Sequence, residues 1–337
     1  RLTLNATLAG GVTISSTSSQ RWTEVAVNSG TLRVNGYTEF GTLSGTGPGK
    51  IIGDGVEPVV SFSQSSDQTY AGTFADANAA APVTWIKSGF SQLTLTGNSK
   101  VGGTVILREG TLWLDGSGGI DPARFDMEQG LLIFAAPGTT TYAAQIEGSG
   151  YITKYGPGRT ELNGGGNFAG SFYIAGGELA IGGQMTSAQV IVHDGALGGV
   201  GSLNSTFVES GGIIAPGNSI GSLSMQSLTL FGTYQAEHSR VQGLVDLLRV
   251  TGLLQLNSAT LFFSDLDGGG ILDGRSHVIA EYGSLEGTFG NVVNLPAGYR
   301  LAYGEGGNTI SLVSVVPESG NCFLLAAGLI FTTRRRR

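Results

Sequence analysis

The chain has little charge, one cysteine and few prolines. Charged residues are 13% of its 337 residues, and the lone thiol is Cys322. Disorder requires low hydrophobicity and high charge, so a content of 40% hydrophobic residues excludes it. One cysteine excludes an intrachain disulfide. Nine prolines are too few for a collagen helix.

Basic residues are also scarce. There are 18 lysines and arginines against 25 acidic residues, and four of the arginines are the last four residues. Nucleic-acid binding requires clustered Lys and Arg, so no nucleic-acid partner is expected. The chain begins at Arg1, which is either a mature terminus left after removal of a signal peptide or the boundary of a fragment.

Glycine, in contrast, is abundant, at 57 residues. Glycine this dense leaves few windows with a favourable helix propensity, which excludes helical bundles and coiled coils. Glycine does supply the positive φ angles that tight corners need. The composition therefore predicts a β-rich chain with many turns.

An internal repeat is present. Residues 84–116 and 151–183 align without a gap at one constant offset. The matching pairs are Lys87/Lys154, Gly89/Gly156, Leu95/Leu162, Gly97/Gly164, Gly103/Gly170, Gly110/Gly177, Leu112/Leu179, Leu114/Ile181 and Gly116/Gly183. One such unit cannot bury its apolar face alone, so repeats of this kind stack into a quasi-one-dimensional coil.

Within each copy, apolar residues alternate with polar ones over a few positions and then stop at glycine. Examples are Thr111–Asp115, Glu161–Asn163 and Glu178–Ile181. This period of two predicts short strands with one buried face. We expect an all-β fold in which residues 1–226 form a right-handed parallel β-helix, a β-solenoid. A β-sandwich is the alternative.

The remaining sequence divides into two segments. Residues 227–314 contain strand patterns separated by larger loops, and we expect them to form a β cap on the last coil, because an open sheet edge needs protection. Residues 315–337 form a tail whose apolar run, 322–331, is shorter than the roughly 20 residues of a spanning helix. Four arginines close this run, which favours transient membrane anchoring over the alternative of a last core strand.

The tail resembles a PEP-CTERM sorting signal. The residues that carry the resemblance are Pro317, Glu318, Ser319, Arg334, Arg335, Arg336 and Arg337. Serine stands where the family often has a second proline, and the apolar run is short. The resemblance implies an exosortase-type processing enzyme as partner, cleavage near the motif during export, and transient membrane association through the tail.

The repeats resemble the autotransporter-associated β-strand repeat. Residues 150–170 follow its pattern of alternating Gly, Leu and Lys, and Ala215–Leu223 is similar to the Pro-Gly-Asn-Ser turn found near the end of such passengers. The resemblance implies a protein that is secreted or held at the cell surface or outer envelope of a Gram-negative-type bacterium. It implies no particular ligand.

Catalytic and metal-binding patterns are sparse. Asp121, Asp126 and Glu128 form the densest acidic cluster, and a polysaccharide lyase or hydrolase would need them to converge on one face. Residues 265–273 resemble half of a calcium loop but fit a solvated β-turn better. His193 precedes Asp194, yet neighbouring strand residues point to opposite faces. No enzyme activity, cofactor or metal is expected.

These observations favour a structural β-helix protein with a passive role. A glycan-binding adhesin is the alternative, with an extracellular polysaccharide as its partner, and a polysaccharide-degrading enzyme is a third hypothesis. The first two differ in whether exposed aromatic residues line one face of the coil. The candidates for such a face are Trp113, Tyr151 and Tyr155.

Overall fold

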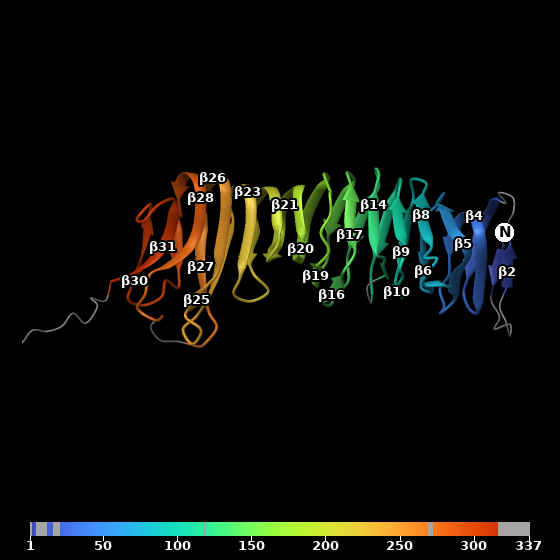
Figure 1. The fold of residues 1–337 in the computed structure, drawn as a ribbon, viewed down its shortest axis with the longest axis horizontal. Helices are drawn as coiled ribbons and strands as arrows, with labels where there is room; N and C mark the ends of the chain where they lie inside the picture. The colour runs from blue at the N-terminus through green and yellow to red at the C-terminus, as the bar shows by residue number, and fades with distance from the viewer. Residues whose placement is uncertain (1, 5–11, 16–20, 117–118, 269–271, 316–337) are drawn as a thin grey trace, which may run out of the picture.

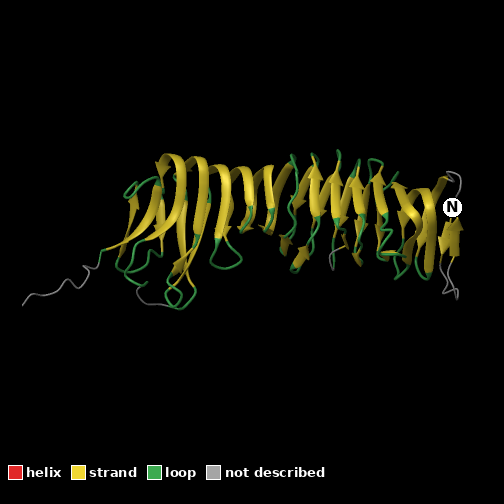
Figure 2. Ribbon diagram, in the orientation of Figure 1, coloured by secondary structure: helices red, strands yellow, loops and turns green. Residues whose placement is uncertain are grey.

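The protein is an elongated stack of β-strands (Figure 1). The computed structural model describes residues 2–4, 12–15, 21–116, 119–268 and 272–315. Within these ranges every regular element is a strand (Figure 2). The described part of the chain therefore contains no helix that could cross a membrane.

The strands fall into three groups along the chain. The first group is β1 (Leu2–Leu4), β2 (Val12–Ser15), β3 (Arg21–Val27), β4 (Thr31–Ser44), β5 (Lys50–Ser63), β6 (Gln68–Tyr70) and β7 (Thr73–Asp76). The second is β8 (Thr84–Ser88), β9 (Gln92–Leu95), β10 (Asn98–Lys100), β11 (Thr104–Leu107), β12 (Thr111–Leu114), β13 (Gly119–Asp121), β14 (Arg124–Met127), β15 (Leu131–Phe134), β16 (Thr140–Tyr142), β17 (Gln145–Gly148), β18 (Tyr151–Lys154) and β19 (Arg159–Leu162). The third is β20 (Ser171–Ile181), β21 (Gln184–Gly199), β22 (Ser202–Pro216), β23 (Ser222–Leu230), β24 (Thr233–Ser239), β25 (Leu244–Val245), β26 (Leu247–Asn257), β27 (Thr260–Asp265), β28 (His277–Thr288), β29 (Asn291–Val293), β30 (Tyr299–Tyr303) and β31 (Thr309–Ser314).

Each coil of the second group contributes three strands. The first face of the stack contains β8, β11, β14 and β17, which pair in parallel, and the second contains β9, β12, β15 and β18. On the first face Lys87 lies beside Leu107, and Leu107 lies beside Met127, so one full coil extends from each of these residues to the next. The predicted β-solenoid is confirmed, and the sandwich alternative is wrong.

A single apolar core runs through the coils. Strands such as β9 and β12 alternate buried and half-buried residues, with Leu93, Leu95, Leu112 and Leu114 pointing inward. Burying one leucine side chain stabilises the fold by about 1.5–3 kcal/mol.

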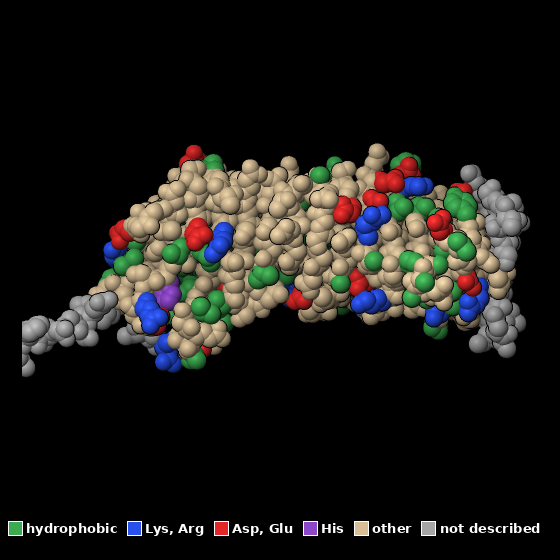
Figure 3. Space-filling view, viewed as in Figure 1, with side chains coloured by type: hydrophobic (Ala, Val, Ile, Leu, Met, Phe, Trp, Pro, Cys, Tyr) green, Lys and Arg blue, Asp and Glu red, His purple; other side chains and the backbone are tan. Residues whose placement is uncertain are grey.

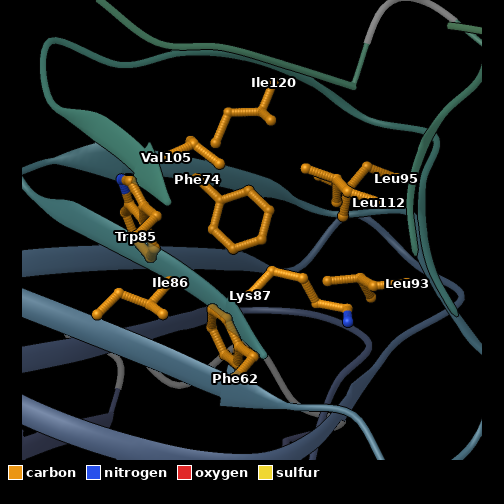
Figure 4. A pocket seen from close by; sticks show the side chains of 10 residues that line it. All are labelled: Phe62, Phe74, Trp85, Ile86, Lys87, Leu93, Leu95, Val105, Leu112 and Ile120. Atoms are coloured by element: carbon orange, nitrogen blue, oxygen red, sulfur yellow. The ribbon is translucent and has the colours of Figure 1, made fainter. Parts of the chain in front are cut away.

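Aromatic rings fill the core of the early coils. The ring centroids of Phe62 and Phe74 are 6.0 Å apart, and those of Phe74 and Trp85 are 4.8 Å apart. Figure 4 shows these rings around an interior gap of about 20 Å³, with the aliphatic part of Lys87 beside Phe62.

The repeated lysine stabilises a corner of the coil. Lys87 Nζ donates to the carbonyl oxygens of Ser88 (3.0 Å), Gly89 (2.7 Å) and Glu109 (2.9 Å). Gly89 has a φ of 74°, which only glycine adopts at low cost, and its carbonyl faces the interior of the corner. The buried ammonium thus donates to backbone acceptors at the sharp turn, where the strand ends.

The second copy of the repeat builds the same corner on a different face. Lys154 Nζ donates to the carbonyl oxygens of Tyr155 (2.9 Å) and Gly156 (3.0 Å), and Gly156 has a φ of 77°. Lys87, however, lies in β8 on the first face, whereas Lys154 lies in β18 on the second. The offset between the two copies therefore corresponds to three coils and one additional face, so equivalent repeat residues are not stacked on one another.

The C-terminal end closes with antiparallel pairing. The expected boundary between residues 226 and 227 falls inside β23, and parallel pairing continues through β26 with β28 and β27 with β29. Antiparallel pairing then joins β28 to β31 and β31 to β30. The sorting-signal residues Pro317, Glu318, Ser319 and Arg334–Arg337 lie outside the described residues.

Candidate binding face

One column of outward-facing residues runs along the second face. Parallel register places each member beside the next, so the column crosses the stack from coil to coil. We call this set the outer column: Thr69, Thr94, Trp113, Ile133, Thr153, Tyr173, Ile191, Phe207 and Thr229. Successive members lie about 4.8 Å apart, the spacing of neighbouring strands.

The three aromatic residues predicted from the sequence lie on this face. The rings of Trp113 and Tyr155 pack edge to face, with centroids 5.6 Å apart and an interplanar angle of 65°. Tyr151 points outward from β18 and is 62% exposed. The structure therefore brings Trp113 and Tyr155 into contact and places Tyr151 on the same outer surface.

The aromatic surface extends further than the sequence analysis predicted. Tyr173 stacks on His193 at 5.8 Å, and Phe207 packs against Phe231 at 5.6 Å. We call Trp113, Tyr151, Tyr155, Tyr173, Phe207 and Phe231 the aromatic ridge. The signal that reveals the added members is the parallel register, which brings Tyr173 beside Thr153, the outer-column residue that follows Ile133.

A polar hollow adjoins the ridge on its N-terminal side. It has a volume of about 570 Å³. Its lining residues are Ala26, Asn28, Ser44, Gly45, Thr46, Asp67, Gln68, Thr69, Gln92 and Thr94. Thr94 is also the register partner of Trp113, so the floor of the polar hollow leads directly onto the aromatic ridge.

Hydrogen bonds hold the lining of the polar hollow in place. Asn28 Oδ1 accepts from the Thr46 backbone N–H at 3.0 Å. Asp67 Oδ1 accepts from the Gln92 N–H at 2.8 Å, and Gln92 Nε2 donates to Thr94 Oγ1 at 2.9 Å. The first two of these contacts join residues from successive coils, so the lining is ordered by the scaffold itself.

Two residues of the acidic cluster considered for polysaccharide degradation, Asp121 and Asp126, lie on different faces of the coil. Asp126 lies in β14 on the first face and pairs with Arg124 at 3.9 Å, while Glu128 pairs with Arg108 at 3.5 Å. Asp121 lies in β13, which pairs with β10 on a third face of the coil, and burial raises the pKa of its carboxyl group. Asp121 thus lies on a different face from Asp126, and Asp126 and Glu128 are each paired with an arginine.

Several other carboxylates and two of the histidines, His193 and His277, take part in local hydrogen bonds. Asp267 Oδ2 accepts from Ser239 Oγ and from the Val241 N–H, and Asp273 lies 2.7 Å from His277 Nε2. His193 Nδ1, in β21, lies 2.7 Å from Glu209 Oε2 in the neighbouring strand β22. Among the described residues, no group of three or more His, Cys, Asp or Glu side chains is arranged to hold a metal ion.

Comparison with known proteins yields two partial similarities. Over 84 residues, or 24% of its length, the chain is 37% identical to the adhesin BmaC autotransporter of Brucella suis biovar 1 (strain 1330). Over 83 residues, or 25% of its length, it is 35% identical to an extracellular serine protease of Serratia marcescens. The chain spans 2% and 8% of the lengths of these relatives. No family model matches the chain.

Proposed function

We propose that the protein is an exported β-solenoid, held at the cell surface or in the extracellular matrix of a Gram-negative-type bacterium, where it serves as a structural element. The observation that carries this proposal is the continuous parallel ladder around one apolar core. Such a ladder resists bending, because each coil is hydrogen-bonded to its neighbours and buries its apolar face against them. The partial similarity to an adhesin autotransporter and an extracellular protease supports a location outside the cytoplasm.

Surface display is tested by antibody labelling of the native host. An antibody raised against the folded solenoid should bind intact cells, or the matrix around them, as strongly as it binds permeabilised cells. A cytoplasmic protein labelled in the same samples is the control for leakage. Labelling that appears only after permeabilisation would contradict the proposal.

We infer that the C-terminal tail directs sorting by an exosortase-type enzyme, with transient membrane association before cleavage. The support is the sequence of Pro317, Glu318 and Ser319 followed by an apolar run and four arginines. Replacing Arg334–Arg337 by serine should leave the protein unprocessed and reduce its surface labelling. Normal processing of this variant would contradict a sorting role for the arginines.

The proposed role is not enzymatic and involves no nucleic acid. Asp121 lies on another face, and Asp126 and Glu128 are each paired with an arginine; this supports the first point, because acid–base hydrolysis of a glycosidic bond needs two carboxyl groups available at one bond. The absence of a nucleic-acid partner is supported by the basic side chains, which are scattered over the face shown in Figure 3. Release of reducing ends from polysaccharides by the purified protein would overturn the non-enzymatic proposal.

A glycan-binding adhesin is the second candidate, and the aromatic ridge favours it. Tyr151, Tyr173 and Phe207 are 62%, 38% and 40% exposed although they lie on a well-formed sheet. Aromatic side chains are typical of binding surfaces, because they bring a large apolar area at a small entropic cost. Adhesion of cells that display the protein to immobilised polysaccharide should fall when Tyr151, Tyr173 and Phe207 are replaced together by serine, and unchanged adhesion would exclude the ridge.

A further inference from the structure

The polar hollow beside Trp113 has the features of a ligand site. We propose that it binds an uncharged glycan, with the sugar hydroxyl groups in the hollow and one sugar ring stacked on Trp113. This inference rests on the proposed surface function and specifies the ligand class of the adhesin candidate. It concerns the N-terminal end of the outer column, where Thr69 and Thr94 lead to Trp113.

The lining of the hollow is polar and mostly uncharged. Most of the side chains that line the hollow carry neutral amide or hydroxyl groups, namely Asn28, Ser44, Thr46, Gln68, Thr69, Gln92 and Thr94. Such groups offer hydrogen-bond donors and acceptors, as sugar hydroxyl groups do. A surface of this kind can therefore pair with several hydroxyl groups of one ligand at the same time.

The charge of the lining favours a neutral ligand. Among the described residues that line the hollow there is no lysine, arginine or histidine, so a glycan carrying carboxylate or sulfate groups would find no cation to pair with. The charged residue in this described lining is Asp67, and its Oδ1 atom already accepts from the Gln92 N–H. The carboxylate disfavours an anionic glycan further, because two like charges repel at close range. The lining thus selects for a neutral chain.

An aromatic surface lies at the edge of the hollow. Trp113 is half-buried and points outward from β12, one strand away from Thr94. Its ring packs against Tyr155, which supports it from the side away from the hollow. A sugar ring has an apolar C–H face and polar edges, so it can stack on the indole while its hydroxyl groups reach the hollow. An aromatic ring beside a polar hollow therefore suits an amphipathic sugar ring better than a purely polar ligand.

The lining of the hollow is held in place by hydrogen bonds. The hydrogen bonds between Asn28 and Thr46 and between Gln92 and Thr94 fix lining side chains before any ligand arrives. A site ordered in advance loses little conformational entropy on binding. Weak individual hydrogen bonds can then add up to useful affinity.

The test starts from the purified full chain and an array of neutral and acidic glycans. The best neutral oligosaccharide from the array is then titrated by calorimetry against the wild type and three variants. Trp113→Ala removes the stacking ring, and Thr69→Glu places a charge in the hollow at an exposed position. Ile191→Ala is the matched control, since it removes an apolar side chain from the same column about 19 Å away, four strand spacings from Trp113. Far-UV circular dichroism confirms that each variant is folded.

The proposal predicts that neutral glycans bind and acidic ones do not. Trp113→Ala and Thr69→Glu should each weaken binding at least about ten-fold, whereas Ile191→Ala should leave it unchanged. Three results would overturn the proposal: no neutral glycan bound, acidic glycans bound as tightly, or equal effects of Ile191→Ala and Trp113→Ala. Failure here together with normal surface labelling of cells would reject the glycan site alone and leave the display function standing.

Discussion

Replacement of the buried lysine of the second repeat copy tests the description of the coil corner. Lys154 is fully buried, and its Nζ atom donates to the carbonyl oxygens of Tyr155 and Gly156. Burial lowers the pKa of its ammonium group from the ordinary 10.5 to about 8. Lys154→Met keeps the aliphatic part of the side chain but removes the donor. Two carbonyl groups of the corner then lack a partner, which costs about 1–3 kcal/mol each.

The effect of this replacement depends on pH in a defined direction. Below about pH 8, Lys154 is charged in both the folded and the unfolded state, and the folded state bears the cost of burying the charge. Between about pH 8 and pH 10.5 the unfolded chain holds the proton and the folded chain does not, so the free energy of unfolding rises with pH. The gap between 10.5 and about 8 corresponds to at most about 3.5 kcal/mol.

Urea unfolding of the wild type and Lys154→Met, followed by circular dichroism at about pH 7 and about pH 10, measures this effect. The advantage of the wild type over the variant should be larger at the higher pH. Lys100→Met, which removes an exposed lysine, is the control and should show no such change. An advantage that stays constant or shrinks with rising pH would refute the assignment of Lys154 as a desolvated corner donor.

Three further predictions concern packing and the cap. Gly164→Ala should destabilise the fold by about 2–3 kcal/mol in a urea titration, because the new Cβ would overlap the Ala144 carbonyl group. Gly138 has open space around it, so Gly138→Ala should leave the stability unchanged. Phe168→Ala, at a fully buried site against Phe172, should lower the free energy of unfolding by about 3–5 kcal/mol. Phe90→Ala, at an 86% exposed site, should change it by no more than about 0.5 kcal/mol. Equal effects of the two replacements would contradict the assignment of Phe168 to the core. Burial raises the pKa of Asp246 from 3.8 to about 7, so the folded state holds this proton more tightly, and the cap should lose stability as pH rises from about 4 to about 7. Amide exchange at Gly221 and Glu237, which donate to Asp246, reports the change, and Asp246→Asn should remove it.

The class of fold follows from the sequence because its causes are local. Alternation in stretches such as Thr111–Asp115 already fixes which side chains point inward, and Leu112 and Leu114 are buried. Glycines such as Gly110 and Gly177, with φ of 67° and 63°, mark corners that other residues take only with strain. The shared lysine of the repeat likewise occupies the same kind of corner in both copies.

The binding face could not be predicted in full because it depends on register between coils. Along the outer column, Phe207 and Thr229 are further apart in the sequence than Ile191 and Phe207 are, although in both cases the two residues lie side by side on neighbouring strands. Coil length therefore varies, and alternation within one strand does not reveal which residue lies beside it in the next coil. The polar hollow combines residues from Ala26 to Thr94, and only the folded stack brings them together.

The measurement that tests the central claim most directly is the intact mass of the protein recovered from its native host, compared with that of the full chain. Export with exosortase-type sorting predicts loss of a C-terminal piece that begins near Pro317–Gly320, in protein taken from the surface or matrix fraction. A protein that ends at Arg337 and is recovered from the cytoplasmic fraction would contradict both the sorting signal and the surface function.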